Sequence, residues 1–258
     1  MTEMLPTEAL FPAPAPAAHG PLRTSWAEGP LLGFDTETTG VSTSTDRIVT
    51  AALVHRHPLL GTSVETWLID PGVEIPEGAS AIHGITTAHA REHGRQPAVA
   101  LEEIARQIAQ ALGEGTPLVA FNATFDLCIL DAELRRHGLR TLAERLGAEP
   151  VGVIDPLVLD RAVDRFRKGK RKLIDLCAVY GVNEAGDLHT ADVDVIATLD
   201  VLEAMARRHP TLAEMSLPVL HAYQVDAHRA WASSFNDWRA RQGFDGPGAG
   251  LSWLVDER

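Results

Sequence analysis

The sequence predicts an α/β domain on a mixed sheet, in which three antiparallel strands are extended by two parallel ones. The order of the elements predicts it: three strand-like apolar runs come first, and two further runs then alternate with helical patterns. With 45% hydrophobic and 22% charged residues among 258, the chain can bury a sizeable core, which excludes wholesale disorder.

The first three runs should form the antiparallel part of the sheet. LLGFDTE (31–37) is typical of a buried strand, and the Thr-Thr-Gly that follows should end it. IVTAALVHR (48–56) and SVETWLID (63–70) should be the next two strands, joined as a hairpin near Pro58 and Gly61.

The parallel strands should alternate with helices. Apolar residues recur at helical spacing over 98–112, and a second helix is expected over about 124–137; a glycine follows each of them. Short buried strands are expected at 117–122 and 150–155, on either side of the second helix. Helical segments fill most of the remaining chain.

The chain divides into a disordered Pro/Ala-rich tail (1–29), a folded domain (30–207), and a C-terminal amphipathic helix and tail (208–258). Six of the 16 prolines lie in the first 30 positions, and Leu10-Phe11 within the tail could dock a partner. The helix after Pro218 could pack on the domain or form a dimer or partner surface. Its apolar stripe includes Leu220, Tyr223, Ala227, Trp231, Ser234 and Trp238.

Charge and targeting signals narrow the function classes. The net charge of -12 argues against coating nucleic acid or membrane through bulk charge, but it leaves room for an enzyme whose carboxylates hold metal ions. There is no transmembrane run and no secretory signal, so we expect a cytoplasmic protein without a membrane partner. Cys128 and Cys177 should be buried thiols, with a disulfide or metal pair as the alternative.

The strongest chemical signal is FDTETTG (34–40). Side chains of a strand alternate between faces, so Asp35 and Glu37 project from the same side, roughly 7 Å apart at the backbone. Two carboxylates that repel each other become favourable when they share a divalent cation. Oxygen-only ligation suits Mg²⁺ or Mn²⁺ rather than Zn²⁺. The alternative is a solvated strand end with incidental acids.

Two further segments carry acids in similar contexts. FNATFD (121–126) places Asp126 in the first turn of a helix, where it could also serve the helix dipole, and Asn122 could hold a sugar or phosphate or form a turn. HTADVD begins with His189 beside a helix N-terminus. Helix periodicity does not choose between Asp192 and Asp194 within it.

FDTETTG, FNATFD and the His-x4-Asp from His189 to Asp194 occur in this order, and together they resemble the three motifs of the DEDDh (DnaQ-like) 3′–5′ exonucleases. That family includes the proofreading epsilon subunit of bacterial DNA polymerase III and RNA-trimming enzymes. The resemblance covers about residues 30–206, implies a ribonuclease-H-like fold and selects Asp194 over Asp192. IHGIT (82–86) is similar to a further family element, whereas Phe121 stands where members often have His.

The resemblance implies a two-metal hydrolase. Asp35, Glu37, Asp126 and Asp194 would hold two Mg²⁺ or Mn²⁺ ions, with Asp35 bridging, Glu37 and Asp194 on the ion that carries the attacking water, and Asp126 on the second. His189 would be the general base, so activity should rise from about pH 6 to 8. The expected products are nucleoside 5′-monophosphates.

Substrate contacts are expected from two regions. The backbone around Thr36 and Thr38 would contact the terminal nucleotide, as could His83, for which a structural turn is the alternative. The run 165–172 carries six positive charges and no acid, and could grip phosphates or be a solvated loop. Its candidate phosphate contacts are Lys168, Lys170, Arg171 and Lys172.

The expected substrate is the 3′ end of single-stranded DNA or RNA, with DNA favoured, in proofreading or repair. A DNA polymerase or clamp could be a partner. The alternatives are an RNA-trimming exoribonuclease of the same family and a non-catalytic, polymerase-associated end-binding module.

Overall fold

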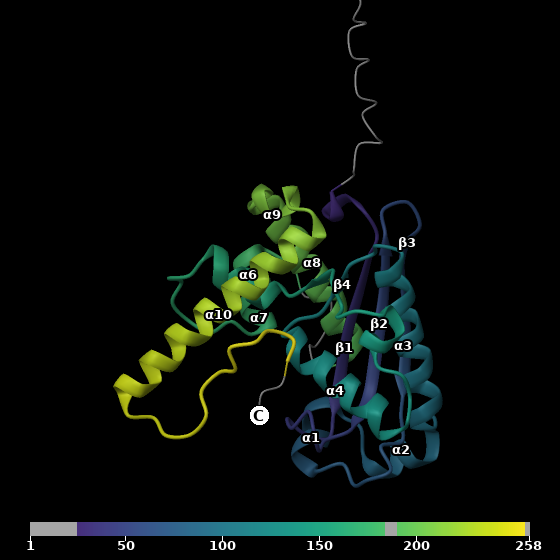
Figure 1. Cartoon of the computed structure of the whole chain (residues 1–258). Helices are drawn as coiled ribbons and strands as arrows, with labels where there is room; N and C mark the ends of the chain where they lie inside the picture. Colours follow the sequence, from purple (N-terminus) through teal and green to yellow (C-terminus); the bar gives the residue numbers. More distant parts are fainter. Residues whose placement is uncertain (1–24, 184–189, 256–258) are drawn as a thin grey trace, which may run out of the picture.

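A five-stranded sheet in the order β3-β2-β1-β4-β5 forms the centre of the molecule in the computed structural model, which describes residues 25–183 and 190–255 (Figure 1). Strand β1 pairs antiparallel with β2 and parallel with β4; β2–β3 is antiparallel and β4–β5 is parallel. The predicted mixed sheet is confirmed. The strands are β1 (Leu31–Thr38), β2 (Ile48–His57), β3 (Gly61–Leu68), β4 (Leu118–Val119) and β5 (Val153–Ile154).

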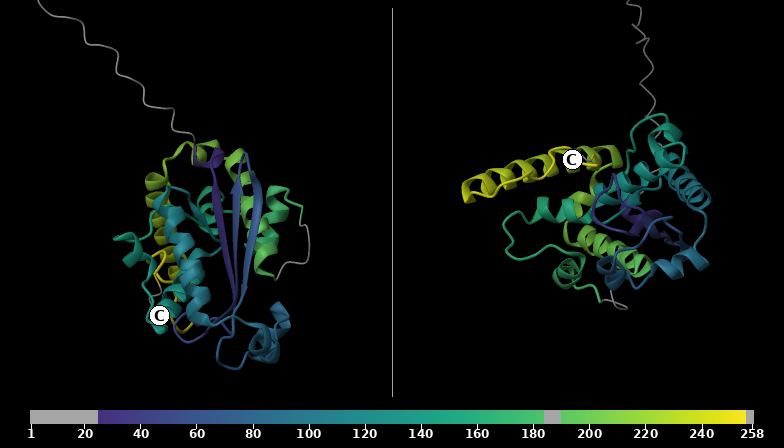
Figure 2. Two further views of the ribbon diagram at one scale, coloured as in Figure 1. Left: turned by 90° about the vertical axis from the view of Figure 1, so that its right-hand side faces the viewer. Right: turned by 90° about the horizontal axis from the view of Figure 1, so that it is seen from below.

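Helices cover both faces of the sheet (Figure 2). The described helices are η1 (Trp26–Glu28), α1 (Glu77–His83), α2 (Thr87–His93), α3 (Pro97–Gly113), α4 (Ala123–Arg136), α5 (Leu142–Leu146), α6 (Pro156–Val163), α7 (Leu173–Tyr180), α8 (Ala191–Arg208), α9 (Pro210–Glu214) and α10 (Leu217–Gln242). Alternation along β1 divides the core between the faces. Leu32 and Phe34 pack with α3 and α4, whereas Leu31 belongs to the cluster that α8 completes.

The two parallel strands are shorter than predicted. Only Leu118–Val119 and Val153–Ile154 pair, against the expected 117–122 and 150–155. After β4, Asn122 adopts a left-handed conformation, with φ 62°, immediately before α4. The segment after β4 therefore leaves the sheet as a turn rather than as an extended strand.

The fold begins before residue 30, so the predicted boundary of the N-terminal tail is wrong for residues 25–29. Trp26 is buried, and its indole nitrogen donates to the carbonyl of Leu212 at 3.1 Å. Ser25 donates to the carbonyl of Ala213 at 2.6 Å. A large apolar ring close to the tail gains by joining the core. Leu10-Phe11 lies outside the described residues.

The C-terminal helix α10 is part of the same packing unit, lying against α6 and β5 (Figure 1). Gln224 is fully buried and accepts a hydrogen bond from the amide of Asp155 at 2.7 Å. Trp253, beyond the helix, is buried in the core with α3 and α4. Of the predicted stripe, Ser234 and Trp238 do not pack on the domain but are exposed, because the distal half of α10 extends past the body (Figure 2).

No helix within the described ranges has the length and apolarity needed to cross a membrane. Cys128 and Cys177 are not joined in a disulfide, and they lie in different parts of the structure.

Candidate active site

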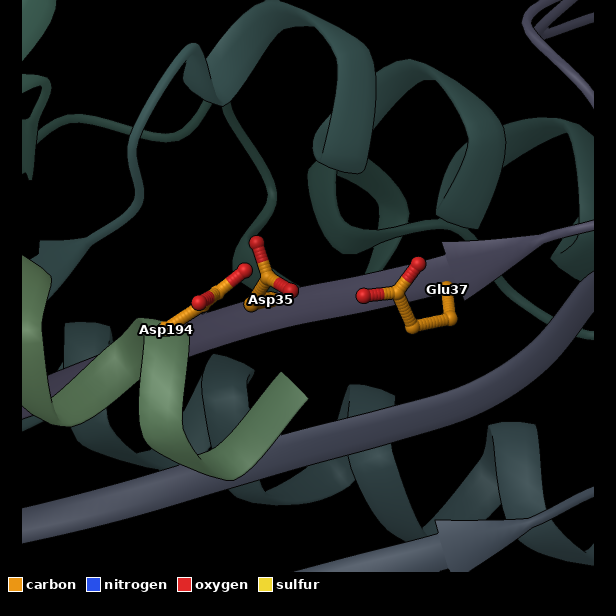
Figure 3. A group of neighbouring side chains, drawn as sticks. All are labelled: Asp35, Glu37 and Asp194. Carbon is orange, nitrogen blue, oxygen red and sulfur yellow. The ribbon is translucent and has the colours of Figure 1, made fainter. Parts of the chain in front are cut away.

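Three carboxylates from two distant segments meet at one point beside the sheet (Figure 3). Asp35 and Glu37 project from the same face of β1, and Asp194 reaches them from the first turn of α8. One ligand oxygen from each residue lies within 4.8 Å of the others. The choice between Asp192 and Asp194 is thereby resolved geometrically, since the group found among the described residues contains Asp194.

Gly33 lets α8 approach β1 closely enough to deliver Asp194. It lies two residues before Asp35 on the same face of the strand. A Cβ at this position would lie 2.2 Å from Cγ1 of Val195 and 3.1 Å from Cδ1 of Leu199. Ordinary carbon contacts lie at about 3.5–4.0 Å, so any side chain here would push the helix or its residues away.

The carboxylates destabilise one another in the absence of a counter-ion. Burial raises the pKa of Asp35 well above its usual range, and the charges of Asp126, Glu37 and Asp194 raise it further. Burial and the charge of Asp194 raise the pKa of Glu37 to about 7. A divalent cation would turn this repulsion into attraction. Because every donor is a carboxylate oxygen, the set fits Mg²⁺ or Mn²⁺.

Asp126 lies beside this group and is tied to the strand. Its Oδ1 accepts hydrogen bonds from the amide of Thr36 at 3.0 Å and from the hydroxyl of Thr36 at 2.7 Å. Burial raises the pKa of Asp126 to about 7, although the Thr36 hydrogen bonds oppose the rise. The Thr36 side chain therefore orients an acid, and only its neighbouring backbone remains a candidate for substrate contact.

Asp155 holds the Asn122 turn in place, and the sequence interpretation missed it. Its carboxylate accepts from the amides of Asn122 at 3.1 Å and Ala123 at 3.0 Å, and from that of Leu157 at 2.9 Å. Gln224 fixes the Asp155 backbone from α10. The available signal was an Asp-Pro pair after a strand, which is typical of a helix N-cap followed by Pro.

A cleft of about 520 Å³ contains the acidic group. It is lined by Asp35, Thr36, Glu37, Ile82, Phe121, Asn122, Phe125, Asp126, Leu157, Arg171, Lys172, Leu173 and Asp194. The acids stand beside the exposed Ile82, the half-buried Phe121 and Phe125, and two basic side chains, so the cleft can contact cations, bases and phosphates together.

His83 and Thr38 do not line the cleft. His83 is 7% exposed and its Nδ1 accepts from the amide of Ile85 at 3.1 Å, while burial lowers the pKa of His83. This arrangement corresponds to the structural turn that was the alternative to a substrate contact for His83. The cleft-lining residue of this segment is its neighbour Ile82. Thr38 donates its hydroxyl to the carbonyl of Gly40 at 2.6 Å.

The basic run divides into structural arginines and exposed lysines. Arg171 and Arg167 both pair with the fully buried Asp160, and Arg171 also donates to three backbone carbonyls. Arg171 also lines the cleft, so the phosphate contact predicted for it stays a prediction, although Asp160 and backbone carbonyls already accept hydrogen bonds from its two terminal nitrogens. Lys168, Lys170 and Lys172 are exposed.

His189, the predicted general base, lies outside the described residues. Its described neighbour Thr190 precedes α8, and the amide of Asp194 donates to the carbonyl of Thr190 at 3.0 Å.

Comparison with known proteins gives a consistent result. The model of the exonuclease family RNase_T matches residues 32–202. An epsilon-like protein of DNA polymerase III from Rhodobacter capsulatus is 34% identical over 213 residues, and a PolC-type DNA polymerase III from Staphylococcus epidermidis is 28% identical over 195. These alignments cover 79% and 75% of this chain but only 28% and 12% of the relatives.

Solved structures share the fold. Escherichia coli exonuclease I in complex with a dT13 oligonucleotide aligns with a TM-score of 0.58 at 21% identity, over 71% of this chain and 42% of that one. A zinc-bound complex of the same enzyme with single-stranded DNA aligns with a TM-score of 0.60 at 20% identity, over 84% and 46%. Because the family model spans about two thirds of the sequence, the chain belongs to the RNase_T family of exonucleases.

Proposed function

We propose that this protein is a metal-dependent 3′–5′ exonuclease that hydrolyses single-stranded nucleic acid to nucleoside 5′-monophosphates. One observation carries the proposal: Asp35, Glu37 and Asp194 converge in an open cleft, with Asp126 beside them. All four acids predicted from sequence thus lie in or beside one site.

The side chains have separate roles in this reaction. Bound divalent cations would supply the positive charge that stabilises the attacking and leaving oxygens of an in-line displacement at phosphorus. Asp35, Glu37 and Asp194 would hold them, and the Thr36 hydroxyl fixes the Asp126 carboxylate beside them by a hydrogen bond. His189 is proposed as the base that takes the proton from the attacking water.

Single-stranded DNA is the favoured substrate. The relatives are named as DNA polymerase III proteins, and the exonuclease I neighbours were solved with DNA oligonucleotides, which supports DNA and a polymerase as partner. RNA trimming is the second candidate, because the choice depends on contacts to the 2′-hydroxyl.

The test is digestion of 5′-labelled single-stranded DNA and RNA with Mg²⁺, Mn²⁺ or EDTA. We expect a ladder of products that differ by one nucleotide with metal, no products with EDTA, and no products when the 3′ end is blocked. Degradation of the 3′-blocked strand, or of a circular strand, would instead indicate an endonuclease.

Metal binding should stabilise the fold more strongly as pH rises. Glu37 and Asp126, with pKa values near 7, are largely protonated at lower pH in the metal-free protein and must lose protons to bind cations. A raised folded-state pKa also means that the metal-free fold loses stability as pH rises toward about 7. At 100 times its Kd, Mn²⁺ should raise Tm by about 5–10 °C at pH 8.

The same Mn²⁺ concentration should give less than half of that shift at about pH 5.5, because protons compete for the carboxylates. Differential scanning fluorimetry over a pH series measures both curves. A metal-induced shift that is equal at both pH values, or larger at low pH, would contradict the proposed ligands.

The exposed lysines should contribute to strand binding. All three lysines of the chain lie at Lys168, Lys170 and Lys172, and Lys172 lines the cleft. Replacing all three with Gln should weaken single-strand binding about tenfold or more, and should reduce the salt slope by up to about 2 while kcat is retained. The matched control replaces the exposed Arg91, Arg106 and Arg207 with Gln. Equal losses in both variants would refute a specific grip.

A further inference from the structure

A second cavity of about 200 Å³ lies beside the cleft and has no part in the chemistry described above. It is enclosed by α6, α10, the start of α4 and the C-terminal segment 248–255. Asn122 lines both this cavity and the cleft, so the two spaces share a wall at the Asn122 turn.

Arg161 supplies the positive charge of this cavity. Its guanidinium lies 3.6 Å from the centre of the Trp231 ring, and it makes no hydrogen bond or ion pair with any described residue. Burial lowers the pKa of Arg161 to about 10, although the charge of Asp155 opposes this. A partly buried guanidinium with unused donors is costly, and an anion would offset that cost.

Asp155 does not supply that anion. It also lines the cavity, but its two oxygens already accept three backbone hydrogen bonds, from Asn122, Ala123 and Leu157. It forms no ion pair with Arg161 within 4.0 Å. Asp155 therefore partly offsets the positive charge of Arg161 but accepts no hydrogen bond from its guanidinium group.

Other polar groups on the wall suit an oxyanion. The Thr124 hydroxyl accepts from the amide of Leu254 at 3.1 Å, which leaves its own hydrogen to donate. The side-chain amide of Asn122 makes no hydrogen bond within the described parts of the chain, and it lies where the cavity meets the cleft. The Trp231 ring keeps the guanidinium in place by stacking.

Building on the proposed nuclease function, we propose that the Arg161 cavity binds a phosphate group, with Arg161 as its main ligand and Thr124 and Asn122 as additional donors. The phosphate comes either from a phosphodiester of the bound strand, upstream of its 3′ end, or from free phosphate and nucleoside monophosphate. Arginine binds phosphate through two parallel hydrogen bonds, which matches the unused donors.

The test measures strand binding separately from cleavage. Affinity is measured with Ca²⁺ in place of Mg²⁺, or in EDTA should Ca²⁺ support cleavage, for oligonucleotides that each carry one neutral methylphosphonate at a successive linkage from the 3′ end. In the parent protein, one upstream linkage should stand out with a loss of about tenfold or more. In Arg161→Gln, that same neutral linkage should cause no further loss.

Arg229→Gln is the matched control, because Arg229 is exposed on α10 and pairs only with Asp226 among the described residues, at 3.8 Å. It should keep the parent pattern. If Arg161 only stabilises the fold, Arg161→Gln should have a lower Tm and should bind every oligonucleotide more weakly by the same factor. The effect of the neutral linkage should then persist in Arg161→Gln, and that pattern overturns the proposal.

A separate arm measures inorganic phosphate and a nucleoside 5′-monophosphate by their effect on Tm. Stabilisation of the parent but not of Arg161→Gln, with a flat linkage scan, assigns the cavity to free phosphate. Absence of both the linkage effect and phosphate stabilisation overturns the site. Neither arm depends on turnover. A failure of the proposed nuclease activity would appear in the ladder assay, so it can be distinguished from a failure of the proposed phosphate site.

Discussion

Asp35→Asn should abolish exonuclease activity while the metal-free fold stays at least as stable as the parent. Asp35 lies close to Glu37, Asp126 and Asp194. In addition to burial, the negative charge of each of these residues raises the pKa of Asp35. The amide removes a buried charge and its repulsion but cannot hold a cation as a carboxylate does. We expect turnover to fall by more than about 10³-fold, or ~4 kcal/mol of transition-state stabilisation.

Turnover of labelled single strand and Tm with and without Mn²⁺ measure this prediction. The variant should also lose the metal-induced rise in Tm. Asp192→Asn is the control, because Asp192 lies on the same first turn of α8 but outside the acidic group. It should retain activity within about twofold, since the half-buried Asp192 is not one of the three acids of the group. Full activity of Asp35→Asn would refute the assignment.

Gly33→Ala should lower both stability and activity, although Gly33 is not among the residues that line the cleft. The new Cβ would overlap Cγ1 of Val195, so α8 must shift or Val195 must leave its rotamer. Overpacking of this kind costs about 1–3 kcal/mol. A displacement of Asp194 on the order of 1 Å should lower turnover about 10²-fold.

A second substitution separates positioning from general destabilisation. Val195→Ala removes the atom that the new Cβ would strike, so the double variant should recover activity to within about tenfold of the parent, even though Val195→Ala alone leaves a small cavity. Gly78→Ala is the control, because a Cβ there meets nothing within 4 Å. Additive losses in the double variant would show that the Gly33–Val195 contact does not position Asp194.

The sheet was predictable because each strand carries its own signal. β1 and β2 are apolar runs of the predicted length, and the hairpin between β2 and β3 forms over the residues between them, as expected. The turn that follows β4 was not predictable, because it is held by Asp155, which Gln224 fixes in turn, and both residues lie far along the chain. No local pattern records such a contact.

At the site, too, local patterns were predictable and contacts between distant residues were not. The positions of Asp35 and Glu37 follow from strand alternation, and the resemblance selected Asp194, which the structure places with them. The sequence could not show that Arg171 is bound to Asp160, because a run of positive charges looks the same whether its members face solvent or a buried acid. Likewise, His83 is buried and its Nδ1 accepts from the amide of Ile85, which a motif alone does not reveal.

Anomalous diffraction at the manganese edge, from crystals grown with Mn²⁺ and a nucleoside 5′-monophosphate, tests the shared cation site most directly. The account predicts two peaks about 3.5–4 Å apart, both bound by Asp35, with Glu37 and Asp194 on one ion and Asp126 on the side of the other. A protein that digests single strands but shows no manganese peak among these carboxylates would contradict it.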